Sequence, residues 1–173
     1  MKLSTIDPAK LARDTVRDAI DRIHGMLFAL APQATYRLEL DDREPESTTV
    51  GHAVASLVLY AQGRARLDAD VHEYCITLIP VAGDALDDSG TPDPMTPLGL
   101  VVAAALARER IEGGSPVSTT QLAILGDVTP GRVRQLVASG ELVAPDGQVM
   151  PTEARRWLGA RGVVLTAALL TTA

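Results

Sequence analysis

Apolar residues recur at every third or fourth position near the start of the chain, which is the spacing of one face of an α-helix. Asp7 and Pro8 precede this stripe as a capping residue and a first helical residue, and Pro32 follows it. The pattern therefore predicts one long helix. The stripe consists of Ala9, Ala12, Val16, Ile20, Ile23, Leu27 and Leu30. It is either core or a dimer seam, and we expect core packing with part of the stripe at an interface.

The following residues alternate between helical patterns and loops that are rich in charge, proline or glycine. Helical spacing predicts three further helices, over 52–61, 68–79 and 98–111. Loops are predicted over 41–49 and 83–97. Weak alternation also predicts a short strand over 35–40. An all-helical bundle is the expected fold of this region.

The last third of the chain opens with two short amphipathic helices joined by a tight turn at Gly126 and Asp127. Ser118 or Thr119 is the expected N-cap of the first helix, and Gln121 has the spacing of a capping box. The apolar face of this helix is Leu122, Ala123 and Leu125.

The second helix begins at Thr129, a capping residue, and Pro130 follows at the first helical position, where its missing N–H costs nothing. The expected buried face is Val133, Leu136 and Val137. The opposite face carries Arg132, Gln135 and, at its border, Arg134.

A turn and a third helix follow. Residues 145–147 (Pro-Asp-Gly) are a strong turn signal between the short apolar runs 142–144 and 148–150, which predicts a small β-hairpin. Pro151 opens the third helix. The side chains expected to cover the hairpin are Ala154, Trp157 and Leu158.

This order of elements resembles the winged helix-turn-helix of excisionases and MerR-like regulators. Ala123 stands at the family's small position, and Val133 and Leu136 stand at two of its aliphatic core positions. Asp127 occupies the position where the turn glycine is commonest. The phrase "V..L..SGEL…G…EA..WL" of residues 133–158 recurs in these folds much as it stands here.

The resemblance implies that the second helix enters the major groove of double-stranded DNA. Thr129, Arg132 and Gln135 would face base edges or adjacent phosphates, because Arg pairs well with guanine and Gln with adenine. Further contacts to the phosphate backbone or the minor groove are expected from Arg134, Gln148, Arg155, Arg156 and Arg161.

The expected fold is mainly α and has two domains. Residues 1–112 form a helical domain for dimerisation or partner binding, 113–117 a linker, and 118–173 a winged helix-turn-helix with a short β-hairpin and a C-terminal tail. A symmetric dimer presents its recognition helices about one DNA turn apart. We therefore expect a homodimeric transcription regulator that binds an inverted repeat.

Charge keeps a second interpretation open. The chain has a net charge of −6, and residues 118–163 hold five arginines against four acidic residues. So small a local excess implies few phosphate contacts per protomer, and tight DNA binding then needs a dimer or a partner. Alternatively, the acidic N-terminal region binds a protein partner, as in a phage or mobile-element adaptor, and the helix-turn-helix is secondary.

Composition points to a cytoplasmic protein without membrane contact. The single cysteine excludes an intrachain disulfide and suits a reducing compartment. The first ten residues lack the apolar core of a signal peptide. The longest apolar runs, near 98–107 and 163–170, are too short to span a bilayer.

Residues suited to catalysis or metal binding are sparse. His72 and Cys75 can share one side of a helix, but a structural zinc site needs about four such ligands, and His24 and His52 are far away in sequence. Cys75 lies in an apolar pattern and is expected to be a core residue. No nucleotide-binding glycine loop, metalloprotease helix or nucleophile elbow occurs. We therefore expect no enzyme activity, no metal and no cofactor.

Overall fold

The computed structural model describes residues 1–30, 48–87 and 89–165 of the chain. Among these residues it has seven α-helices and a two-stranded antiparallel sheet, so the expected mainly α fold is confirmed. No helix in the described part is both long and apolar enough to cross a bilayer. The strand predicted over 35–40 and most of the loop predicted over 41–49 lie outside the described residues.

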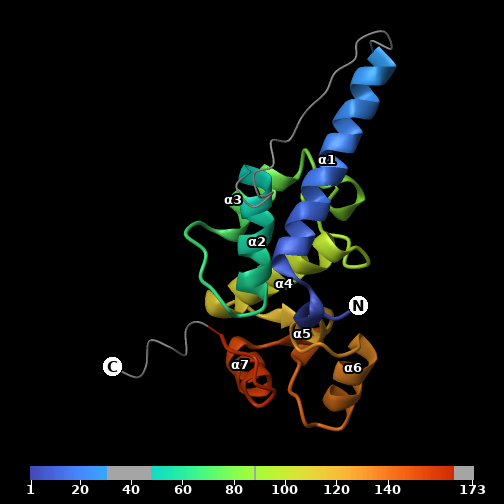
Figure 1. The fold of residues 1–173 in the computed structure, drawn as a ribbon. Helices are drawn as coiled ribbons and strands as arrows, with labels where there is room; N and C mark the ends of the chain where they lie inside the picture. Colours follow the sequence, from blue (N-terminus) through green and yellow to red (C-terminus); the bar gives the residue numbers. More distant parts are fainter. Residues whose placement is uncertain (31–47, 88, 166–173) are drawn as a thin grey trace.

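The long N-terminal helix α1 (Pro8–Leu30) begins as predicted, because the Asp7 Oδ1 accepts a hydrogen bond from the Lys10 N–H at 2.9 Å. Its first half packs on α2 (Thr49–Ala61), and its second half extends beyond the other helices (Figure 1). Within the predicted stripe, Ala12 and Val16 are buried, whereas Ile23 is 37% exposed. Met26, which is outside the stripe but in the same half of the helix as Ile23, is 62% exposed. The apolar side of α1 is therefore core only in its first half.

Capping residues set where α2 and α3 (Val71–Leu78) begin. The Thr48 Oγ1 accepts the Gly51 N–H at 2.9 Å, which starts α2 three residues earlier than the apolar pattern predicts. The Asp70 Oδ1 accepts the Glu73 N–H at 2.9 Å, which starts α3 later than predicted.

Helix α4 (Pro97–Glu112) runs through the centre of the molecule, where it contacts α1, α2 and α3 (Figure 1). It begins at Thr96, whose Oγ1 accepts the Gly99 N–H at 3.1 Å. Gly99 is required for packing, because an added Cβ would lie 2.0 Å from the carbonyl oxygen of Asp93. The fully buried side chains of α4 include Val101, Val102, Ala104, Ala105, Ala107 and Ile111.

The C-terminal part packs against the other end of α4 (Figure 1). Its elements are β1 (Val117–Ser118), α5 (Thr119–Leu125), α6 (Pro130–Ala138), β2 (Gln148–Val149) and α7 (Pro151–Gly159). Three short 3-10 turns complete the described chain: η1 (Leu3–Thr5), η3 (Gly83–Ala85) and η4 (Pro145–Gly147).

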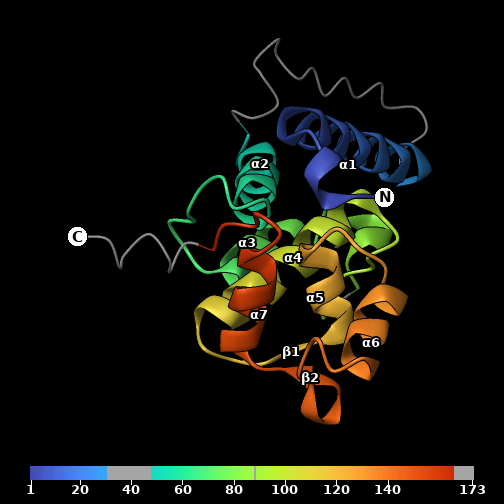
Figure 2. The ribbon, with the colours of Figure 1, turned by 90° about the horizontal axis from the view of Figure 1, so that it is seen from below.

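The predicted β-hairpin between 142–144 and 148–150 is wrong. Strand β2 pairs with β1, the strand that precedes α5, and Val117 lies opposite Val149 (Figure 2). Burial explains this choice, because both of these valines are fully buried whereas Val143 is 63% exposed. The two strands are therefore separated in the chain by α5 and α6, and residues 142–150 do not form the hairpin expected of a wing.

One hydrophobic core continues through both predicted domains. Leu57 and Ile111 from the first belong to the same cluster as Leu122 and Leu158 from the second. Within the predicted linker, Val117 is fully buried. The division of the chain at 113–117 stays a prediction.

Candidate nucleic-acid interface

Helix α5 begins at a complete capping box, as the sequence predicts. The Ser118 Oγ accepts the Gln121 N–H at 3.2 Å, and the Gln121 Oε1 accepts the Ser118 N–H at 2.9 Å. Two backbone donors that a helix end leaves open are thereby satisfied. The apolar face formed by Leu122, Ala123 and Leu125 is buried.

The turn between α5 and α6 has a fixed geometry. Asp127 has a φ of 50°, which is the left-handed conformation that glycine adopts most readily. The Val128 N–H donates to the Ala123 carbonyl at 3.0 Å. The Thr129 Oγ1 accepts the Arg132 N–H at 3.2 Å and caps α6, as predicted. These bonds fix the direction in which α6 leaves α5.

The polar side chains predicted for α6 lie together on its outer surface. Val133 and Leu136 point into the core, and Val137 is half-buried. The exposed residues are Thr129, Arg132, Arg134 and Gln135. Among the described residues, no carboxylate forms an ion pair with either arginine. Both guanidinium groups are therefore available to an anion in solution.

The position of Gln148 differs from the predicted one. It is exposed in β2, where it pairs with Ser118 at the beginning of α5. The pairing with β1 places it beside α5 instead of on a separate hairpin. Its side chain is open to solvent, and its part in DNA binding stays a prediction.

Two candidates on α7 have partners within the protein. The half-buried Arg155 donates from Nη2 to the carbonyl oxygens of Ile111 at 2.7 Å and Glu112 at 3.1 Å, at the end of α4. A cation at a helix C-terminus is favourable, so Arg155 holds α7 against α4. Arg156 is exposed, and its Nη2 lies 2.6 Å from the Glu153 carboxylate. The hydrogen bond from Arg156 lowers the pKa of the Glu153 carboxyl.

Sequence reasoning missed a buried polar cluster formed by Tyr60, Arg108 and Glu112. The Arg108 Nε and the Tyr60 hydroxyl donate to the two Glu112 carboxylate oxygens at 2.9 and 2.8 Å. The Arg108 guanidinium also stacks 5.1 Å from the Tyr60 ring centroid and donates to the Val164 carbonyl at 2.7 Å. The one sequence signal is the spacing of an arginine and a glutamate four residues apart on an apolar helix.

The residues considered for metal binding or catalysis stay apart. Among the described residues, no group of three or more His, Cys, Asp or Glu side chains is arranged to hold a metal ion. Cys75 is buried in the core, as predicted, and burial raises the pKa of its thiol to about 11.

Comparison with models of protein families, with curated proteins and with solved structures finds no match to this chain.

Proposed function

We propose that this protein binds double-stranded DNA in a sequence-specific manner, with α6 as the recognition helix. The observation that carries the proposal is the outer surface of α6, where Thr129, Arg132 and Gln135 lie at successive helical turns and are exposed. The capping box, the left-handed Asp127 and the Thr129 cap hold this helix rigidly against α5. A rigid helix with a polar outer face is what major-groove recognition requires.

The residue types suit base recognition. Arginine forms two hydrogen bonds with the O6 and N7 of guanine, and glutamine forms two with adenine. Arg132 and Gln135 are three residues apart, so they project from the same side of α6. Arg134 on α6 and Arg156 on α7 are exposed and are assigned to phosphate contacts, and so is Gln148 in β2, which contacts α5.

Homodimerisation is the second part of the proposal, because the net charge of −6 makes sequence-independent attraction to DNA weak. Two recognition helices on one inverted repeat compensate for few phosphate contacts per protomer. We assign the dimer contact to the second half of α1, where Ile23 and Met26 are exposed on a helix that extends beyond the body. We expect Met26→Asp to convert the dimer to a folded monomer in sedimentation velocity.

Selection from random DNA duplexes tests the DNA-binding proposal directly. The full-length protein is incubated with the duplexes at about 0.15 M salt, where non-specific binding is suppressed. We expect enrichment of one palindromic motif. Arg132→Ala should weaken binding to that motif by roughly 5- to 150-fold, which corresponds to the loss of one bidentate base contact.

Arg66→Ala is the matched control, since it removes the same charge from an exposed loop far along the chain from α6. It should leave the motif and the affinity unchanged. A protein that enriches no motif at any concentration would contradict DNA recognition.

A second function is favoured by one observation: the apolar side chains of Ile23 and Met26 are exposed within the N-terminal region, residues 1–112, which is acidic as a whole. If DNA selection fails, these residues become the contact surface of an adaptor that binds another protein in the cytoplasm. Met26→Asp would then abolish capture of that protein, while Arg132→Ala would not.

A further inference from the structure

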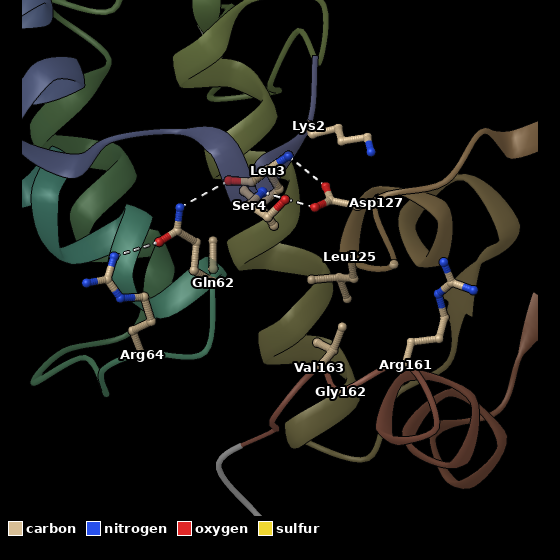
Figure 3. Close-up of a pocket in the computed structure, with 12 residues that line it drawn as sticks. Lys2, Leu3, Ser4, Gln62, Arg64, Leu125, Asp127, Arg161, Gly162 and Val163 are labelled. Carbon is tan, nitrogen blue, oxygen red and sulfur yellow. Dashed lines mark hydrogen bonds between the residues drawn. The ribbon is translucent and has the colours of Figure 1, made fainter.

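A groove of about 530 Å³ lies beside the α5–α6 turn, and nothing in the DNA-binding proposal uses it (Figure 3). Residues 2–4 form one wall and the end of α2 a second. Residues 125–127 and 161–163 complete the lining. This volume falls within the range of small-molecule binding sites.

Three cationic side chains line the groove: Lys2, Arg64 and Arg161. Among the described residues, no carboxylate forms an ion pair with any of them. The acidic residue in the lining, Asp127, is already engaged, because its two carboxylate oxygens accept the N–H groups of Leu3 and Ser4. The groove is therefore positive although the chain as a whole is negative.

Part of the floor of the groove is apolar. It consists of Leu3, Ala61, Leu125 and Val163, of which the first three are at most 4% exposed. In Figure 3 the side chains of Leu125 and Val163 lie between Arg64 on one side and Arg161 on the other. An occupant would thus meet a small apolar patch, at which the half-buried Val163 is the most exposed side chain, between positive charges.

We propose that this groove binds a small organic acid, in which a carboxylate is carried on an apolar chain. The cationic edges select the negative charge, and a carboxylate matches the planar donor pattern of an arginine. The apolar patch around Val163 binds the chain, because the contact removes both surfaces from water. This inference does not depend on DNA binding, although the Asp127 turn that lines the groove also orients α6.

The protein carries its own reporter of occupancy. The Arg161 guanidinium lies 4.9 Å from the ring centroid of Trp157, which is the single tryptophan of the chain. A carboxylate that draws Arg161 away from this ring removes a cation from the indole face. Trp157 fluorescence therefore changes when the groove is filled.

The test is a fluorescence titration of the full-length protein with three probes: octanoate, octanamide and inorganic phosphate. Octanamide keeps the shape and the chain of octanoate but lacks its charge, and phosphate keeps a charge but lacks the chain. We expect a saturable change in Trp157 emission with octanoate, and binding roughly tenfold weaker for each of the other two probes. Amide chemical shifts should move at residues 2–4, 125–127 and 161–163.

The variant Lys2→Gln/Arg64→Gln removes two of the cations and leaves the Arg161–Trp157 contact intact. Both side chains are exposed, and among the described residues the Arg64 Nη1 donates only to the Gln62 Oε1, at 3.3 Å, so we expect the variant to keep the fold. Its affinity for octanoate should fall by roughly tenfold, whereas the control Arg66→Gln, which lies outside the groove, should bind like the wild type. Equal affinity for octanoate and octanamide, or an unchanged affinity in the double variant, would overturn the proposal. Because no DNA is present in this titration, neither of these results would bear on the DNA-binding proposal.

Discussion

Asp127 and Leu3, which are 124 residues apart in the chain, are joined by a hydrogen bond of 2.7 Å from the Leu3 N–H to the Asp127 Oδ1. The second carboxylate oxygen accepts the Ser4 N–H at 3.1 Å. Asp127 also has a φ of 50°, which few residue types adopt readily. One residue therefore shapes the α5–α6 turn and anchors the beginning of the chain to it.

Replacing Asp127 with glycine separates these two roles. Glycine adopts the left-handed conformation without strain, so the turn keeps its shape, while both hydrogen bonds to residues 3 and 4 are lost. We expect a decrease of about 1–2 kcal/mol in the free energy of unfolding. Hydrogen exchange should show loss of protection at the Leu3 and Ser4 amides.

Asp146→Gly is the matched control for this substitution. Asp146 has a φ of 51° but is exposed and anchors no distant segment among the described residues. Its replacement should leave the stability within about 0.5 kcal/mol of the wild type. Retained protection at Leu3 and Ser4 in Asp127→Gly would contradict the anchoring role.

Trp157 packs so close to Gly126 that there is no space for a side chain at this position. A Cβ added at Gly126 would lie 2.5 Å from an atom of the Trp157 ring. We expect Gly126→Ala to reduce the free energy of unfolding by about 1–3 kcal/mol, because the ring must move out of its packed position. Urea denaturation followed by Trp157 fluorescence measures both the stability and the displaced ring.

Gly131→Ala provides the contrast, since an added Cβ there meets its nearest atom at 3.8 Å. Gly131 is the second residue of α6, and alanine is the better helix former. This variant should be stabilised by about 0.5–1 kcal/mol. Equal effects of the two substitutions would show that helix propensity, and not contact with Trp157, governs position 126.

Features that depend on neighbours in sequence could be predicted from the sequence alone. The capping box of Ser118 and Gln121 and the Thr129 cap need only a few consecutive residues, and each is found as predicted. The same holds for the start of α1 at Asp7. In each case a side chain satisfies a nearby backbone donor, so residue type and spacing suffice.

Features that depend on distant contacts could not be predicted in this way. Strand β1 has two residues and carries no strand signal of its own, yet burial of Val117 against Val149 decides the pairing of the sheet. Arg155 is of a residue type that often contacts phosphate, but only the three-dimensional structure shows that it bonds to carbonyls at the end of α4. A turn motif or a charged residue in the sequence does not indicate which distant residues it will contact in the folded chain.

Cys75 should react slowly with alkylating reagents in the folded protein. Its thiol is 3% exposed, and burial together with the negative charges of Glu109 and Asp70 raises its pKa to about 11. Since the thiolate is the reactive form, the iodoacetamide rate at pH 8 should be roughly 100-fold lower than in urea. The rate should then increase about tenfold per pH unit towards pH 11. A rate equal to that in urea would contradict the buried position.

Tyr60 should make the protein less stable at alkaline pH. Burial raises the pKa of the Tyr60 hydroxyl, and its hydrogen bond to the Glu112 carboxylate raises it further. In the unfolded chain a tyrosine loses its proton near pH 10, whereas in the folded protein Tyr60 stays neutral well above that pH. Its contribution is therefore complete below pH 10 and decreases as the pH rises towards the folded pKa.

Tyr60→Phe removes this pH dependence together with the hydrogen bond. At pH 7 the variant should be less stable than the wild type by about 1 kcal/mol. Above pH 10 the wild type should lose this advantage at a rate approaching about 1.4 kcal/mol per pH unit, which is the largest slope that one proton allows.

Urea denaturation of both proteins between pH 7 and pH 11 measures the difference in their free energies of unfolding. Groups that titrate equally in both proteins cancel from this difference. A difference that stays constant across this range would mean that Tyr60 ionises equally in the folded and unfolded states. We expect a difference that changes with pH, because a phenolate at Tyr60 would be buried and would face the Glu112 carboxylate 2.8 Å away. The Arg108 guanidinium beside the ring acts in the opposite direction and offsets only part of this cost.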